Sequence, residues 1–137
     1  MSPLLDTCTL LWLVSNRAEL SPAAARAIDE AREIFVSAAS AFEIGTKHRR
    51  GRLLLHDAPA QWWRIVVERM QLTELSITPA VALMSTTLPT ELIVEGKPVE
   101  HRDPGDRFLV ATAASYSLTL VTPDPMIAAY PNTPVLW

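Results

Sequence analysis

Residues 4–14, LLDTCTLLWLV, decide the architecture of this chain, because they join two apolar runs through a single acidic residue. Leu4 and Leu5 suit a short buried strand, and residues 9–14 suit a buried helix that follows it. Asp6 then lies at the carboxyl end of the strand. A strand that passes directly into a helix is typical of α/β proteins, so we expect this pattern to recur along the chain.

Helix caps and β-prone runs continue the alternation. Ser21-Pro22 is an N-cap signal, and Ser40, Asp57 and Thr78 mark further helix starts. The predicted helices cover residues 23–33, 40–50, 57–70, 79–86 and 107–116, with a short turn or helix at 125–129. The predicted strands cover residues 34–36, 72–77, 119–122 and 134–136, and residues 88–102 are the least regular stretch. These elements predict an α/β fold with a mainly parallel central sheet of about four to five strands flanked by helices.

Length and composition favour one domain. The chain has 137 residues, of which 49% are hydrophobic, which suits a single core over residues 1–137. No apolar run reaches the ~18 residues that a membrane span needs, and Asp6 interrupts the first apolar stretch too early for a signal peptide. Cys8 is the only cysteine, so no internal disulfide is possible. We expect a cytoplasmic protein without a membrane partner.

The net charge of −3 does not favour nucleic-acid binding through bulk electrostatics, which usually needs a clear excess of lysine and arginine. Composition averages over the whole surface, however. A carboxylate cluster that holds divalent cations is acidic in sequence and yet presents positive charge to a phosphate. The distribution of acids along the chain therefore matters more than their sum.

Four acids fall where the predicted sheet would bring them together, namely Asp6, Glu43, Asp106 and Asp124. Two of them follow strands and two lie in the predicted first turns of helices, and ligand sites in open parallel sheets form at this edge. Two carboxylates ~4 Å apart repel by about 4 kcal/mol at an effective dielectric constant of 20, so protons or a cation must compensate. Oxygen ligands without a histidine or cysteine cluster favour Mg²⁺ or Mn²⁺ over zinc.

Each acid also has an ordinary structural explanation. Glu43 would complete a capping box with Ser40, and Asp103 would cap the helix whose dipole Asp106 complements. Asp6 and Asp124 suit a strand-end cap and a turn. The joint placement of four acids on one edge of a sheet favours a functional site over four independent caps.

Four segments in order resemble PIN-domain toxins of the VapC family: LLDT at residues 4–7, SAASAFEI at 37–44, HRDPGDRFLVA at 101–111 and LVTPD at 120–124. The resemblance spans nearly the whole chain. It implies a PIN fold, Mg²⁺- or Mn²⁺-dependent hydrolysis of RNA to 5′-phosphate and 3′-hydroxyl ends, neutralisation by a VapB-type antitoxin, and a homodimer.

The resemblance also implies roles for individual residues. The metal-site acids would be Asp6, Glu43, Asp106 and Asp124, with Thr122 orienting a ligand or a water. Thr7 and Asp103 would hold these acids in place without binding the metal themselves. For Asp103 we favour the simpler role of helix cap. Gly105 stands where relatives often carry a bulky apolar residue.

Basic and aromatic residues give secondary hypotheses. The candidates for RNA contact are Lys47, Arg49, Arg50 and Arg107. Basic residues at the end of a helix are as well explained by the helix dipole and by solvation. Trp12, Trp62 and Trp63 suit a surface for an antitoxin helix or a second copy of the chain. Adjacent tryptophans on a helix point in different directions, so one of Trp62 and Trp63 belongs to the core.

Other enzyme classes fit less well. Cys8 has no histidine at a spacing that suggests a thiol nucleophile. Phosphoaspartate hydrolases need a second aspartate two positions after the first, where this chain has Cys8. Two further functions stay open: a catalytically silent PIN-like module that binds RNA or protein, and a PIN nuclease of RNA maturation without an antitoxin. Activity is favoured because none of the four acids is replaced by Ala, Ser or Asn.

Overall fold

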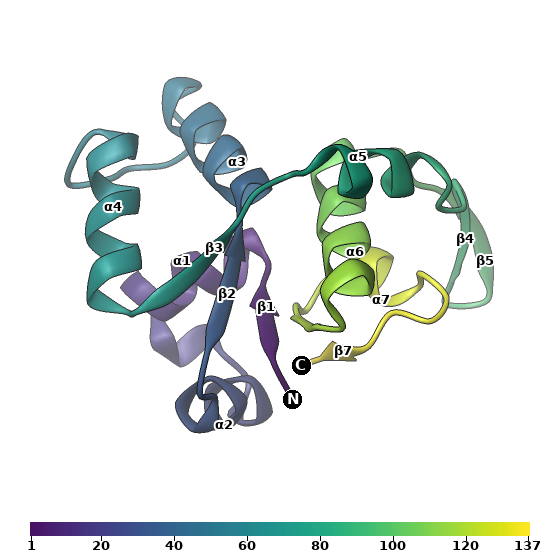
Figure 1. The fold of residues 1–137 in the computed structure, drawn as a ribbon, viewed down its shortest axis with the longest axis horizontal. Coiled ribbons are helices and arrows are strands. Elements are labelled where there is room, and N and C mark those ends of the chain that lie inside the picture. The colour runs from purple at the N-terminus through teal and green to yellow at the C-terminus, as the bar shows by residue number, and fades with distance from the viewer.

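A computed structural model describes residues 1–137 and places a parallel sheet of five strands at the centre (Figure 1). The strand order is β3-β2-β1-β6-β7. The strands are β1 (Pro3–Leu5), β2 (Ile34–Ser37), β3 (Leu72–Leu75), β6 (Thr119–Val121) and β7 (Val135–Leu136). The predicted fold class, including its number of strands, is confirmed.

Helices cover both faces of this sheet, and Figure 1 shows α4 and α6 on opposite sides of it. The helices are α1 (Thr7–Ser15), α2 (Pro22–Glu30), α3 (Ala38–Arg49), α4 (Pro59–Arg69), α5 (Pro79–Thr86), α6 (Pro104–Tyr116) and α7 (Pro125–Ala128), with a 3₁₀ turn at Arg17–Glu19. None of these helices has both the length and the apolar character that crossing a bilayer requires.

Two hydrophobic cores lie on the two faces of the sheet, and alternate residues of the central strands divide between them. Leu5 and Val121 belong to the core formed with α1 to α4, whereas Leu4 and Leu120 belong to the core formed with α6 and α7. All four side chains are fully buried. Because successive strand residues point to opposite faces, a parallel sheet covered on both sides needs apolar residues at every position.

The order of the strands identifies the edge where a ligand site forms. The chain passes from β1 to β2 and then outward to β3, and it later returns to place β6 on the other side of β1. The strand order therefore reverses between β1 and β6, and ligands bind beyond the carboxyl ends of strands at such a switch point. Asp6 follows β1 directly, and Thr122 follows β6 directly.

The stretch predicted as irregular contains a β-hairpin, which the sequence reading missed. Strand β4 (Glu91–Val94) pairs antiparallel with β5 (Lys97–Glu100), apart from the main sheet. Glu95 and Gly96 join them with φ of 51° and 77°, the positive values that a tight two-residue hairpin turn requires. Pro98 is tolerated in β5 because one side of an edge strand needs no N–H.

Some predicted boundaries are wrong at α3. The helix begins at Ala38 and is capped by Ser37, whose hydroxyl accepts a hydrogen bond from the Ala39 N–H at 3.0 Å. The capping box between Ser40 and Glu43 does not form, because Ser40 is a buried residue inside the helix and Glu43 lies in the second turn. Strand β2 therefore passes into α3 without a loop.

The paired tryptophans behave as expected, because Trp62 belongs to the core. Trp63 is partly buried and donates its indole N–H to Glu74 Oε1 at 2.5 Å. Trp12 packs against Trp137, with ring centroids 5.6 Å apart. These contacts occupy part of the aromatic surface that was considered for a partner.

Candidate functional site

Five acids gather beyond the carboxyl ends of the strands, and we call them the acidic edge: Asp6, Glu43, Asp103, Asp106 and Asp124. Their proximity is visible in the pKa of Asp106, which rises from 3.8 to about 7. Burial is the largest cause, and the charges of the other four acids add to it. The fold thus brings together the four acids that the sequence predicted, with Asp103 beside them.

Asp6 acts as a helix cap and as a member of the acidic edge at the same time. Its Oδ1 accepts a hydrogen bond from the Thr9 N–H at 2.8 Å, and its Oδ2 accepts one from the Thr122 hydroxyl. The Thr122 oxygen in turn accepts the Asp124 N–H at 3.0 Å. Thr122 therefore joins the acid that follows β1 to the acid that follows β6.

Glu43 is held from two sides. The buried Thr7 hydroxyl donates to Glu43 Oε2 at 2.6 Å, and Lys47 Nζ lies 2.9 Å from Oε1. Thr7 also contacts the Ser40 hydroxyl at 3.1 Å. Since Thr7 opens α1 and Glu43 lies on α3, this contact fixes one helix against the other at the acidic edge.

Asp106 contacts a buried histidine that the sequence reading did not assign to the site. His101 Nε2 lies 3.2 Å from Asp106 Oδ2, and His101 Nδ1 lies 2.8 Å from the Tyr130 hydroxyl. Arg107 donates to the same hydroxyl at 3.3 Å. These contacts connect Asp106 through His101 and Tyr130 to Arg107, and the tautomer of His101 sets the direction of its two hydrogen bonds. The available signal was the position of His101 within the segment that contains Asp106.

Asp103 is the helix cap, as the sequence reading favoured. Its Oδ1 accepts a hydrogen bond from the Asp106 N–H at 3.2 Å. Its charge nevertheless is the second largest cause of the raised pKa of Asp106. The Asp103 side chain therefore caps α6 and also adds its charge to the acidic edge.

The assignment of Arg107 to RNA contact is wrong. Its side chain is buried and donates to the carbonyl oxygens of Ser85, Leu88 and Pro89 at 2.9, 2.8 and 2.7 Å. These carbonyls lie at the end of α5 and in the segment before β4, outside the regular hydrogen-bond pattern of helix and sheet. The guanidinium group satisfies a buried turn and does not face the acidic edge.

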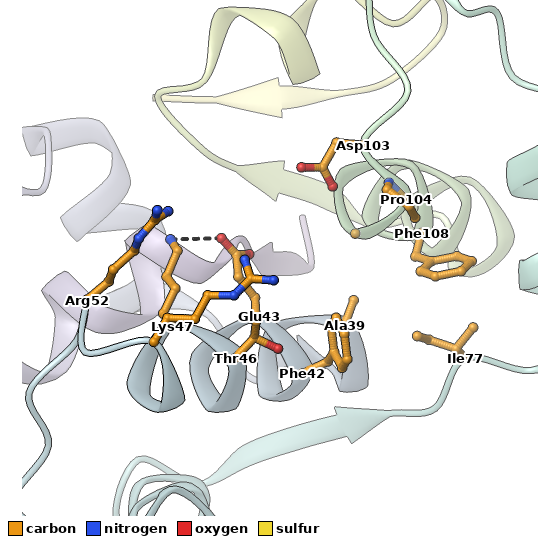
Figure 2. Close-up of a pocket in the computed structure, with 12 residues that line it drawn as sticks. Ala39, Phe42, Glu43, Thr46, Lys47, Arg52, Ile77, Asp103, Pro104 and Phe108 are labelled. Atoms are coloured by element: carbon orange, nitrogen blue, oxygen red, sulfur yellow. Dashed lines mark ion pairs between the residues drawn. The ribbon is translucent and has the colours of Figure 1, made fainter.

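The other basic candidates lie on or near a groove of about 460 Å³ beside the acidic edge. Figure 2 shows this groove between α3 and the start of α6, with the ion pair of Lys47 and Glu43 at one end. Arg50 and Arg52 also line the groove, whereas Arg49 is exposed and lies outside the lining.

Cys8 is not prepared for nucleophilic chemistry. Burial and then the neighbouring Asp6 raise the pKa of its thiol to about 12. The thiol donates to Asp6 Oδ1 at a sulfur–oxygen distance of 3.5 Å. A nucleophilic cysteine needs its pKa lowered, so this environment argues against a thiol mechanism, as does the absence of a suitably spaced histidine.

The acidic edge has the donor chemistry of a site for a hard cation. Its groups are carboxylate and hydroxyl oxygens, and after burial the charges of the neighbouring acids contribute to the raised pKa of Asp106. No three acidic, histidine or cysteine side chains are already grouped at ligand spacing. The predicted acids thus lie close enough for their charges to act on Asp106, but they are not arranged at the distances of a formed metal site.

Comparisons with known proteins agree with this arrangement. The model of the PIN domain matches residues 4–132. The chain is 30% identical to Ribonuclease VapC22 of Mycobacterium tuberculosis (strain ATCC 25618 / H37Rv) over 136 residues, which cover 98% of this chain and 97% of that protein.

Solved structures show the same fold at lower identity. VapBC2 from Rickettsia felis, bound to a DNA fragment from its promoter, matches with a TM-score of 0.67 and 16% identity, covering 99% of this chain and 98% of that one. DNA-bound VapBC from Salmonella typhimurium matches with a TM-score of 0.66 and 21% identity, covering 99% and 97%.

Proposed function

The chain belongs to the PIN domain family and, within it, to the VapC ribonucleases, and from this premise we propose that it is a metal-dependent endoribonuclease and the toxin of a toxin–antitoxin pair. Residues 1–137 form one such domain in this proposal. The observation that carries the proposal is the gathering of five carboxylates at the switch point of the sheet, where burial and then the charges of the other four acids raise the pKa of Asp106 to about 7.

Asp6, Glu43, Asp106 and Asp124 are the residues that would hold Mg²⁺ or Mn²⁺. When bound, the metal supplies an activated water and neutralises charge that develops on the phosphoryl oxygens. Thr122 keeps Asp6 and Asp124 in register through its two hydrogen bonds, and Thr7 keeps Glu43 directed to the edge. The expected products carry 5′-phosphate and 3′-hydroxyl ends, and no side-chain nucleophile is needed.

The partners follow from the same family membership. VapBC2 from Rickettsia felis and VapBC from Salmonella typhimurium were both solved on DNA. We propose that a VapB-type antitoxin neutralises this chain in the cytoplasm and that the chain forms a homodimer. A short neighbouring gene for a DNA-binding protein would supply this antitoxin, and loss of growth inhibition when both are expressed together tests the pairing.

Cleavage of total cellular RNA by the purified chain tests the enzymatic proposal. We expect cutting in Mg²⁺ or Mn²⁺ that stops in EDTA and in the Asp106→Asn variant. Asp29→Asn is the matched control, because Asp29 is an exposed acid paired with Arg17 far from the acidic edge. Equal cutting by the Asp106→Asn variant would refute the assigned site, and no cutting by folded, antitoxin-free protein would favour a silent binding module.

A further inference from the structure

The groove beside the acidic edge changes its chemistry along its length. Figure 2 shows Lys47 and Arg52 at one end and Ile77 and Phe108 at the other, with Phe42 on the helix between them. Its volume of about 460 Å³ falls within the range of about 300–1,000 Å³ that is usual for small-ligand sites. The groove therefore offers an apolar compartment and a cationic compartment next to each other.

Phe42 is the unusual residue of this surface. Its side chain lies on α3 directly before Glu43, and the residue is 75% exposed. Phe108 contributes a second aromatic ring from α6 to the same groove. An exposed aromatic ring beside a charged site is what stacking with a nucleic-acid base requires, because every base has a π-face.

The cationic end distinguishes between possible occupants. Arg50 and Arg52 line the groove, and neither takes part in the ion pairs of the structure. An apolar peptide segment would fill the aromatic end but would leave these charges without partners. A nucleotide matches both ends, since it joins an aromatic base to a phosphate.

We propose that the groove is a nucleotide subsite, in which Phe42 stacks on an unpaired base beside the scissile phosphate while Arg50 and Arg52 contact backbone phosphates. This subsite rests on the proposed ribonuclease function and names the side chains that would hold one nucleotide of its RNA substrate. The base must be unpaired, because a base inside an A-form helix is already stacked and its edges are poorly accessible.

Binding of a fluorescein-labelled single-stranded RNA of twelve uridines tests the subsite. All proteins carry Asp106→Asn, so that the probe is not cut, and anisotropy gives the affinity. We expect Phe42→Ala and Phe42→Leu to weaken binding by about 5- to 100-fold and Phe42→Trp to retain it. The variants should fold, because the ring is 75% exposed. Leu83→Ala is the matched control, since Leu83 is 69% exposed on α5 outside the groove.

Two further measurements separate stacking from charge. On a probe with abasic residues in place of uridine, the difference between the Phe42→Ala variant and its parent should disappear. Arg50→Gln and Arg52→Gln should each reduce the slope of log affinity against log salt by about 0.7, the value for one phosphate contact on a single strand. The Phe42 variants should leave this slope unchanged.

The outcomes distinguish this proposal from the function on which it rests. If RNA is cut by the unmodified chain but Phe42→Ala binds the probe as tightly as its parent, the subsite is wrong and the ribonuclease stands. If Phe42→Leu binds the probe like the parent while Phe42→Ala does not, the contact needs apolar volume and not an aromatic ring, and the stacking role of Phe42 is wrong. If the unmodified chain neither binds nor cuts RNA, both proposals fail together.

Discussion

The ionisation of the Asp106 side chain affects the stability of the folded protein. Its pKa is about 7 in the folded protein and 3.8 as its ordinary value, so the folded chain holds this proton over a wider pH range than the unfolded chain. Stability contributed by the protonated form is therefore lost as the pH rises from about 4 to about 7. At pH 8, in the absence of metal, the ionised group destabilises the fold.

Asp106→Asn should consequently stabilise the metal-free protein at pH 8. The full difference in pKa corresponds to about 4 kcal/mol at 1.36 kcal/mol per pH unit, and solvent reduces it, so we expect a gain of about 1–3 kcal/mol. At pH 4 the variant and its parent should have similar stability. Urea unfolding at both pH values measures this, and an equal gain at the two values would contradict the origin assigned to the raised pKa.

His101 holds the Asp106 side chain in place through their 3.2 Å contact. Replacing His101 should therefore lower the affinity for metal by more than the accompanying loss of folding stability accounts for. Groups that orient metal ligands typically change metal affinity or activity by about 10- to 100-fold when they are replaced. We expect such a loss for His101→Phe and a smaller one for Tyr130→Phe, which removes only the hydroxyl that contacts His101 Nδ1. Titration of Mn²⁺ by calorimetry measures the affinity. A His101→Phe variant that is less stable but binds Mn²⁺ normally would show a purely structural histidine.

Single residues of the site differ in how far the sequence predicts them. The four acids could be assigned because each stands at the end of a strand or near the start of a helix, and the resemblance to VapC toxins added Thr122. Tyr130 could not, because it approaches the site only through a contact with His101, 29 positions away in the chain. Arg107 was assigned wrongly because its position next to Asp106 does not reveal that its guanidinium turns towards the segment after α5.

At the scale of elements, α6 depends on its cap. Asp103→Ala removes both the cap and the charge and should lower the free energy of unfolding by about 1 kcal/mol. Asp103→Asn retains a capping oxygen and removes only the charge, so it should keep nearly normal stability. The two variants should have the same activity if Asp103 acts through its charge alone. Parallel unfolding and cleavage measurements separate the two roles, and equal stability of both variants would refute the cap.

The junctions between elements explain which parts of the fold were predictable. Asp6 follows β1 directly and caps α1, and Asp124 lies three residues after the end of β6 and caps α7, so local sequence marks these boundaries. The hairpin of β4 and β5 was missed because Glu95 at a positive φ is not a residue that signals a tight turn. The capping box at Ser40 was wrong because Ser37 provides a cap three residues earlier.

For the whole molecule, metal binding should offset the repulsion within the acidic edge. Mg²⁺ or Mn²⁺ at about 100 times its dissociation constant should stabilise the chain by about 2.7 kcal/mol, because it binds the folded state. The gain should be larger at pH 8 than at pH 6 at a fixed metal concentration, because protons compete at Asp106 below about 7. Thermal unfolding with and without metal measures it, with Asp106→Asn as the variant that should lose most of the gain. A pH-independent gain would contradict a role for Asp106 as a ligand.

The net charge of −3 is an example of a whole-chain property that misleads on its own. It argues against RNA as a partner, whereas the fold collects acids at one edge and leaves Arg50 and Arg52 beside it. The placement of these charges on the surface depends on the order of the strands in the sheet, which cannot be read directly from the sequence.

The pairing of β1 with β6 also has a consequence during protein synthesis. Asp6 leaves the ribosome before its partner Thr122, which is made 116 residues later. Strand β1 has no neighbour on one side until β6 has been made. Pairings between strands that are far apart in the sequence form late in folding. A nascent chain therefore carries an incomplete acidic edge until the segment that contains Thr122 and Asp124 has left the ribosome. We expect a ribosome-bound chain to be harmless to the messenger RNA from which it is being translated.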